Sequence, residues 1–279
     1  MIRRLRITVL VNDVARAPLA AEHGLALWVE ADGLRILFDT GQGTVLFANA
    51  AALCVDLRTV QHVVLSHGHY DHTGGLAAVL SVAKQRPNVY LHPAALLPKY
   101  SRRETPPHRS IGIPRGAEKA LRTHAETVWT SGPTRIANGV AVTGPIPRAH
   151  SFEGAIGPFF QDEACTVPDP LIDDQALYIQ TTDGTALLLG CAHAGVANTV
   201  DYVTSTTGKP IRAVVGGMHL LNAPTERLEA TRDFLMRINA RLVAPAHCTG
   251  EGPAAFLTAA VPHCVPCTVG SSFQLGDER

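Results

Sequence analysis

A histidine-rich loop between an expected strand and an expected helix places the strongest constraint on this chain. The loop spans residues 66–75 and holds three imidazoles and one carboxylate between His67 and His72. The apolar run 62–65 before it predicts a buried strand, and residues 74–80 after it predict a helix start. Packing does not explain so many ligand-type side chains in one loop. The sequence therefore predicts a metal site at the end of a strand.

The spacing within the loop indicates which of its side chains can bind the same metal ion. His67 and His69 are two residues apart, so in an extended segment both point the same way and can bind one ion. Asp71 and His72 come where the chain turns into the helix, so their side chains can point in a different direction from those of His67 and His69. Four diverging ligands suit two ions roughly 3.5–4 Å apart better than one ion. We expect two divalent ions, zinc first and manganese or iron as alternatives.

Two more histidines follow buried-strand patterns far along the chain. Residues 185–190 form an apolar run, and His193 lies in the small-residue loop after it. Residues 241–246 form another such run, and His247 follows it directly. We expect a metal site at the end of one strand to take further ligands from the ends of other strands, so both histidines are candidate metal ligands.

The H-x-H-x-D-H loop resembles the signature of the metallo-β-lactamase superfamily. The resemblance implies an α/β fold, an αβ/βα sandwich of two mixed β-sheets flanked by helices, with the metals at one edge. Alternating strand and helix patterns after residue 176 agree with such a layered architecture. The resemblance also implies two ligand sets: His67, His69 and His193 for one ion, and Asp71, His72 and His247 for the other.

Further motifs are similar to one branch of that superfamily. The branch is labelled 7,8-dihydropterin-6-methyl-4-(β-D-ribofuranosyl)aminobenzene-5'-phosphate synthase-like metallohydrolases. The resemblance runs from about residue 5 to 275 and is specific for the branch rather than for a substrate. Its motifs stand in order at residues 22–25, 36–42, 144–148, 152–153, 173–177, 190–193, 216–220 and 247–250.

One position departs from the common pattern of the superfamily. Many relatives have a bridging Asp at the end of the strand that lies between the motifs of His193 and His247. Here that strand, residues 211–216, continues as Gly-Gly-Met-His-Leu without a carboxylate. His219 is the ionisable residue there, and it could be a metal ligand, a general acid, a substrate contact or a structural histidine of the loop. Without a bridging carboxylate, the sequence does not decide whether a second metal ion binds.

Other polar positions carry weaker patterns. Asp39 follows an apolar run, and in the superfamily an Asp there often accepts a hydrogen bond from a ligand histidine, although a plain turn Asp is equally compatible. His23, beside Glu22, could line the metal cleft or be incidental. The pair Asp173 and Asp174 precedes a strand, which favours solvated charge.

An irregular segment interrupts the alternation of strands and helices. Residues 93–118 are rich in proline, and long irregular segments inside compact domains are more often functional than idle. We expect a single domain over residues 1–279 with a cleft-capping insertion near 93–118. Basic side chains of this segment could meet an anionic substrate such as a phosphate, with a solvated loop as the alternative: Lys99, Arg102, Arg103, His108 and Arg109.

Composition bounds the partners and the compartment. A hydrophobic content of 46% in 279 residues suffices for a full core, and 24 basic residues balance 24 acidic ones. We therefore expect a small anionic partner, neither nucleic acid nor a membrane surface, and a homo-oligomer is compatible. No run reaches the roughly 20 apolar residues of a membrane helix. No apolar segment of 7–15 residues follows the basic residues 1–6 before Asn12 and Asp13, so we expect no secretory signal and a cytoplasmic location.

The cysteines agree with a reducing compartment. Cys191 and Cys248 adjoin proposed metal histidines, where a thiol could tune or bind a metal. Cys264 and Cys267 form a lone C-x-x-C, for which chance or a thiol pair is favoured over a redox or zinc role. Cys54 lies in an expected helix, where a buried reduced thiol is ordinary.

These patterns together predict an enzyme. We expect a metal-dependent hydrolase in which metal-bound hydroxide attacks a phosphoester or a related anionic ester. Asp71 and His219 are the candidate catalytic residues, with His219 as proton donor to the leaving group. One alternative is a transferase resembling ribofuranosylaminobenzene 5'-phosphate synthase, in which the metals would bind diphosphate. An iron-dependent redox protein is another, and a non-catalytic metal protein is disfavoured because structural zinc sites are usually closed.

Overall fold

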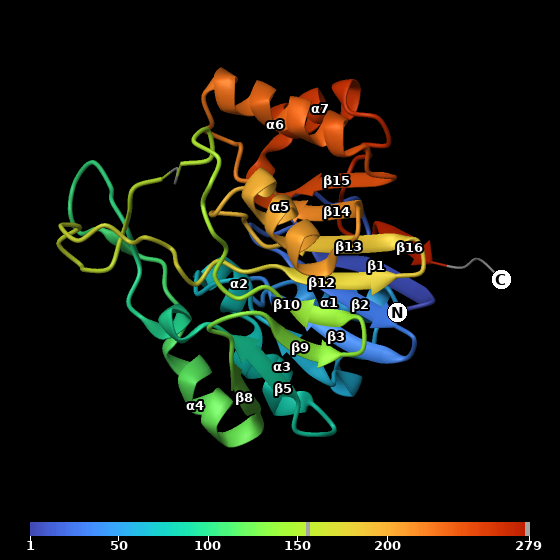
Figure 1. Ribbon diagram of the computed structural model, residues 1–279. Coiled ribbons are helices and arrows are strands. Elements are labelled where there is room, and N and C mark those ends of the chain that lie inside the picture. The colour runs from blue at the N-terminus through green and yellow to red at the C-terminus, as the bar shows by residue number, and fades with distance from the viewer. Residues whose placement is uncertain (155–156, 277–279) are drawn as a thin grey trace.

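Two mixed β-sheets packed face to face form the centre of the protein (Figure 1). A computed structural model describes residues 1–154 and 157–276. The seven-stranded sheet has the order β16 (Ser272–Gly276), β1 (Arg4–Val11), β2 (Ala26–Ala31), β3 (Leu34–Phe38), β4 (His62–Val64), β5 (Asn88–Leu91), β8 (Glu126–Trp129). The six-stranded sheet has the order β15 (Leu242–Ala246), β14 (Ile211–Gly217), β13 (Gly184–Leu189), β12 (Leu177–Thr181), β10 (Val140–Val142), β9 (Thr134–Ala137).

Helices cover the outer face of each sheet. The seven-stranded sheet packs against α1 (Leu46–Ala52), α3 (Leu76–Val82) and α4 (Arg115–His124). The six-stranded sheet packs against α5 (Val196–Thr207), α6 (Thr225–Ile238) and α7 (Glu251–Ala260). In Figure 1, α6 and α7 lie at the top of the view and α3 and α4 lie towards the bottom, with strands of the sheets between them. The expected α/β sandwich is confirmed.

Alternating apolar side chains explain the three hydrophobic layers. In β3, Ile36 and Phe38 point into the core between the sheets, whereas Leu37 points outward to the helices. In β13, Ala186 and Leu188 face the central core, and Leu187 faces α5 and α6. Successive side chains of a strand point to opposite faces, so a continuous apolar run predicts a strand that is buried on both sides.

Several elements were not expected from the sequence. The strands β8, β9, β10 and β16 are short or lie at sheet edges, and β16 pairs with β1 from the other end of the chain. Such strands depend on tertiary pairing more than on local propensity. The expectation that residues 93–118 are irregular was wrong at its end, because α4 begins at Arg115.

The segment 93–118 contributes two strands to a small third sheet. Its β6 (Tyr100–Ser101) pairs with β7 (Arg109–Ser110) and with β11 (Phe159–Phe160). In Figure 1 these loops project to the left of the view, on the side of the short helix α2 (Tyr70–Thr73). Among the residues that the structure describes, no helix is long and apolar enough to span a bilayer.

Candidate metal centre

The predicted site residues converge because strands of both sheets end at one edge. In the seven-stranded sheet, β3 and β4 run parallel, and their carboxyl ends lead to Asp39 and to the histidine loop. In the six-stranded sheet, β13, β14 and β15 run parallel and lead to His193, His219 and His247. The carboxyl ends of strands are where open α/β sheets commonly bind their ligands.

The structure brings the six predicted ligands together in the two expected sets. His67, His69 and His193, here called the first cluster, place one nitrogen each within 4.8 Å of one another. Asp71, His72 and His247, the second cluster, do the same with a carboxylate oxygen and two nitrogens. The clusters adjoin, since the ring centroids of His67 and His72 are 4.3 Å apart.

Asp39 orients one histidine of each cluster. Its Oδ2 accepts hydrogen bonds from Nδ1 of His72 and from Oγ of Ser66, both at 2.7 Å. Since the single hydroxyl proton of Ser66 goes to Asp39, its Oγ accepts from Nδ1 of His67 at 2.9 Å. In the neutral rings both Nε2 atoms then keep a lone pair directed inward. Such supporting carboxylates fix the tautomer of ligand histidines.

Asp13 does the same for His247. Its Oδ1 accepts from Nδ1 of His247 at 2.7 Å, and its Oδ2 accepts from Nδ1 of His23 at 2.9 Å. The Nε2 of His23 lies 3.3 Å from Oδ2 of Asp71, so His23 reaches the edge of the second cluster. Glu22 turns away and accepts backbone N–H groups of the loop before α1, among them that of Gln42.

Unpartnered buried atoms show that the donor set fits metal ions. Among the described residues, both ring nitrogens of His193 and Nε2 of His69 are buried without a hydrogen-bond partner. Nitrogens also face one another, with Nε2 of His67 lying 2.9 Å from Nδ1 of His69 and Nε2 of His72 lying 3.2 Å from Nε2 of His247. Buried polar atoms normally have partners, and a cation would satisfy these lone pairs.

Burial keeps the first cluster neutral. Desolvation lowers the pKa of His67 and of His193 well below the ordinary histidine value. It lowers the pKa of His69 to about 4. At neutral pH these rings therefore keep lone pairs that a metal can use.

Carboxylates dominate the electrostatics of the second cluster. Desolvation opposes charge on His72, but Asp39 and Asp71 outweigh it and raise the pKa of that ring. Desolvation likewise opposes charge on His247, and Asp13 and Asp71 raise its pKa well above the ordinary value. Burial alone would raise the pKa of Asp71, yet the neighbouring histidines lower it. The second cluster therefore stabilises positive charge.

The backbone at the centre is strained. Asp39, Ala192, His219 and His247 have φ between 48° and 58°, although none is a glycine. Side chains with a Cβ adopt this left-handed region rarely, at a cost of order 1–3 kcal/mol each. These residues all follow strands at the same edge of the sheets, and His247 begins a short 3-10 helix there. Asp39, His219 and His247 each place a polar side chain at this edge, and Ala192 precedes His193.

Buried charged side chains support the histidine loop and the loop of His193 through hydrogen bonds and ion pairs. Asp173 accepts the backbone N–H of Gly68 at 2.8 Å and pairs with Nζ of Lys99 at 3.0 Å. Lys99 also pairs with Asp169 at 2.8 Å. Asp174 accepts the backbone N–H of Ala194, next to His193, and burial raises its pKa to about 7. The expectation that Asp173 and Asp174 are solvated was wrong, because both support ligand loops.

A cavity of about 440 Å³ opens over both clusters. Phe159 forms one wall, with its ring 5.1 Å from that of His69 and 5.4 Å from that of His193. His219 lines the cavity, and its ring lies 4.4 Å from that of His193. Arg109 also lines it and stacks over Tyr70 at 4.6 Å.

The basic residues of the segment 93–118 have different places. Arg109 is the one that lines this cavity. Lys99 is buried in its two ion pairs, so a direct contact of Lys99 with substrate was a wrong expectation. Arg102 stacks over Phe160, and His108 accepts the backbone N–H of Arg103.

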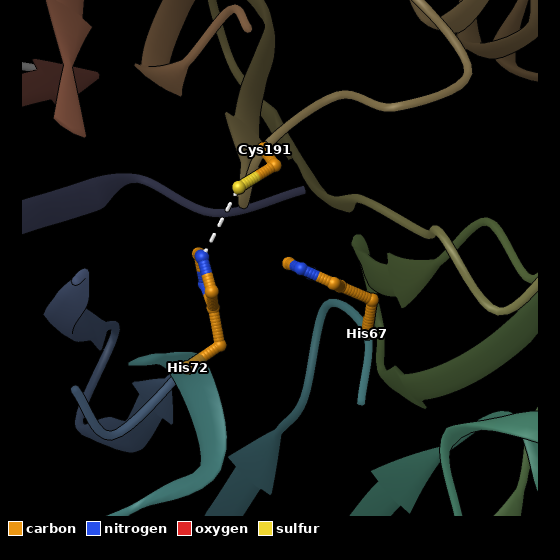
Figure 2. A group of neighbouring side chains, drawn as sticks. All are labelled: His67, His72 and Cys191. Carbon is orange, nitrogen blue, oxygen red and sulfur yellow. Dashed lines mark hydrogen bonds between the residues drawn. The ribbon is translucent and has the colours of Figure 1, made fainter. Parts of the chain in front are cut away.

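The cysteines near the centre are free thiols. Sγ of Cys191 lies 3.1 Å from Nε2 of His72 (Figure 2). Cys191, His219 and Cys248 form another group of possible ligands within 4.8 Å. Cys264 and Cys267 are also free, and they belong to two different hydrophobic clusters.

Sequence reasoning missed two residues of the site. Asp13 follows the apolar strand β1, as Asp39 follows β3, so the same signal could have found it. Phe159 comes from a loop rich in proline and glycine and carries no signal that marks it. Its place depends on the pairing of β11 with β6.

Comparisons with known proteins agree on one family. The sequence profile of the metallo-β-lactamase superfamily matches residues 20–247. An uncharacterized protein of Methanocaldococcus jannaschii is 30% identical over 244 residues, which are 88% of this chain and 90% of that protein. Another protein of that organism is named 7,8-dihydropterin-6-methyl-4-(β-D-ribofuranosyl)-aminobenzene-5'-phosphate synthase. It is 30% identical over 264 residues, 88% of each chain.

Solved structures agree with this result. Tm1679, a metal-dependent hydrolase of the β-lactamase superfamily, superposes with a TM-score of 0.84 at 29% identity, over 98% of this chain and all of that one. A diphosphatase of the PhnP family has a TM-score of 0.56 at 14% identity, over 99% of this chain and 98% of that one, which shows a shared fold alone. The profile match, the relatives and the fold show that this chain belongs to the metallo-β-lactamase superfamily.

Proposed function

We propose that this protein is a metal-dependent hydrolase of phosphoesters or related anionic esters. The observation that carries the proposal is the convergence of two three-ligand clusters at the floor of one open cavity. Among the described residues, Nε2 of His69 and both ring nitrogens of His193 are buried without a hydrogen-bond partner, and the cavity leaves room for a substrate above the clusters. Structural zinc sites, by contrast, are closed on all sides by protein ligands.

The first and second clusters would each hold one divalent ion. Such ions lower the pKa of a coordinated water and stabilise the charge that develops in an ester transition state. Zinc suits the imidazole-rich donor set, with manganese or iron as alternatives. The resemblance to Tm1679 supports the reaction class and says nothing of the substrate.

Residues of this chain have distinct roles in the proposed reaction. Asp71 supplies the carboxylate of the second cluster and keeps a negative charge despite its burial. His219 lines the cavity next to His193, where it can give a proton to the leaving oxygen. Arg109 lies at the wall and binds the anionic group of the substrate. Phe159 covers the first cluster and limits access of bulk water.

A panel of phosphomonoesters, phosphodiesters and carboxylic esters, assayed with zinc-, manganese- and iron-loaded protein, tests the proposal. We expect turnover of an anionic ester by the wild type and its loss in His67→Ala. The matched control is His124→Ala at the exposed end of α4, which should keep full activity. Failure of every ester to react, or equal activity in His67→Ala, would refute the proposal.

One observation favours a second candidate function. The relative named as a synthase covers 88% of this chain at 30% identity. In a transferase of that kind, the metal clusters would bind the diphosphate of a phosphoribosyl donor. Incubation with such a donor and an aminobenzoate-like acceptor separates the two functions. A coupled product supports the transferase, whereas release of diphosphate or phosphate without coupling supports hydrolysis.

A further inference from the structure

Cys191 faces the space between the two clusters. Its Sγ lies 3.1 Å from Nε2 of His72, a member of the second cluster. A ligand nitrogen of His67, a member of the first cluster, lies within 4.8 Å of both atoms. Figure 2 shows the three side chains pointing toward one another, and Cys191 is only 3% exposed. A sulfur in this position can reach an ion in either cluster.

The neighbouring strand β14 cannot supply a side chain to this space. A Cβ on Gly217 would lie 2.3 Å from the backbone oxygen of Gly190 and 2.7 Å from Sγ of Cys248. A Cβ on Gly216 would lie 2.0 Å from the backbone oxygen of Leu189. Real Cβ atoms essentially never come closer than 3.0 Å, so these glycines keep β13 and β14 in close contact. These glycines leave no space for the carboxylate that many relatives have at the end of this strand, and the loop after β13 provides Cys191 instead.

The second thiol of the site has a different environment. Sγ of Cys248 lies 3.6 Å from the backbone oxygen of Cys191, and its group of possible ligands consists of Cys191 and His219, without a histidine of either cluster. Among the described residues, Cys191 is the thiol whose sulfur lies within 4.8 Å of a ligand nitrogen of both His67 and His72. The two cysteines can therefore be distinguished by experiment.

We propose that Cys191 provides a thiolate that bridges the two metal ions. When the ions bind, the thiol proton leaves to solvent, and two lone pairs of the sulfur coordinate the two metals. A soft sulfur ligand favours zinc or iron over manganese, magnesium and calcium, whose preferred ligands are oxygens. The inference rests on the metal centre of the proposed function and not on its substrate.

Cobalt substitution of the full-length protein tests the bridge without any assay of activity. Thiolate bound to Co²⁺ produces an intense near-ultraviolet charge-transfer band, which imidazole and carboxylate ligands do not produce. We expect the band, with two ions per chain, in the wild type. Cys191→Ser should lose the band and most of the second ion, and Cys191→Asp should recover the second ion without the band.

Two control variants separate Cys191 from other thiols. Cys264→Ser replaces a buried thiol in the core below α7, where the hydroxyl of Thr258 can bond to the new serine. Cys248→Ser replaces the second thiol of the site. Both should keep the charge-transfer band. A band that persists in Cys191→Ser, or that disappears in Cys248→Ser alone, would overturn the inference.

A measurement on the wild type keeps the inference testable if the variants do not fold. X-ray absorption of the zinc-loaded protein should show a sulfur neighbour at about 2.3 Å, near one per zinc because both ions share it. Two bound zinc ions without a sulfur neighbour would refute the bridge and leave the proposed hydrolase intact. Absence of any metal binding would instead refute the metal centre and with it the proposed function.

Discussion

Asp39→Asn is the substitution that most directly probes how the fold prepares the metal ligands. Asp39 is fully buried and accepts three hydrogen bonds of 2.7 Å, from the backbone N–H and the hydroxyl of Ser66 and from Nδ1 of His72. An asparagine has one acceptor oxygen. Whichever way its amide turns, its NH₂ group faces at least one donor, which costs about 1–3 kcal/mol of stability.

The same change should weaken metal binding. Without the negative charge, the Nδ1 proton of His72 is held less strongly, and the ring becomes a poorer ligand. Loss of such a partner typically costs 10–100-fold in metal affinity, or about 1.4–2.7 kcal/mol. We expect this loss mainly at the second cluster, because His67 is oriented through Ser66 rather than by Asp39 directly.

Competitive zinc titration with a chromophoric chelator measures the affinity, and urea unfolding of the metal-free protein measures the stability. Asp32→Asn is the matched control, since Asp32 also has a positive φ and accepts backbone N–H groups, but at an exposed site remote from the clusters. Asp13→Asn provides a second test at a more exposed carboxylate that orients His247. Titration curves of Asp39→Asn that coincide with those of the wild type would refute the reasoning.

Three further predictions concern residues around the centre. Lys99→Met leaves two buried carboxylates unpaired and should cost about 3–5 kcal/mol in urea unfolding, whereas exposed Lys84→Met should change little. Arg109→Ala should raise KM for an anionic ester about 10-fold or more with little change in kcat, whereas the exposed control Arg122→Ala should leave KM unchanged. Equal KM values for Arg109→Ala and the wild type would contradict the assigned contact. The pKa of Asp174 is raised by burial from 3.8 to about 7, so between these pH values the folded state binds more protons and stability falls as pH rises. In the metal-free protein, Asp174→Asn should remove at most about 4 kcal/mol of this decline in unfolding free energy. If the unfolding free energy of the variant falls with pH as steeply as that of the wild type, this prediction is wrong.

The sequence predicted the centre well where ligands follow apolar strands. His67, His193 and His247 each come shortly after a continuous apolar run, and such runs are strands buried on both faces. Parallel strands end at the same edge, so this pattern made His193 and His247 candidate ligands, and the resemblance to the superfamily implied how the ligands divide into two sets. The positions of β3 and β13 follow from the same pattern.

Other features depend on contacts that no local pattern carries. Asp173 and Asp174 resemble surface charge in sequence, yet both are buried: Asp173 pairs with Lys99 and accepts the backbone N–H of Gly68, and Asp174 accepts the backbone N–H of Ala194. The sequence marks Cys191 as a possible ligand, but the proposed bridge depends on the close approach of β13 and β14, which leaves no room for a side chain at Gly217. Phe159 reaches the first cluster through a two-residue strand pairing between distant loops.

Anomalous diffraction from crystals grown with zinc tests the central claim most directly. The account predicts two anomalous peaks roughly 3.5–4 Å apart. One should lie about 2.0–2.1 Å from nitrogens of His67, His69 and His193, and the other at a similar distance from ligand atoms of Asp71, His72 and His247. A single peak, or peaks away from these six side chains, would contradict the account.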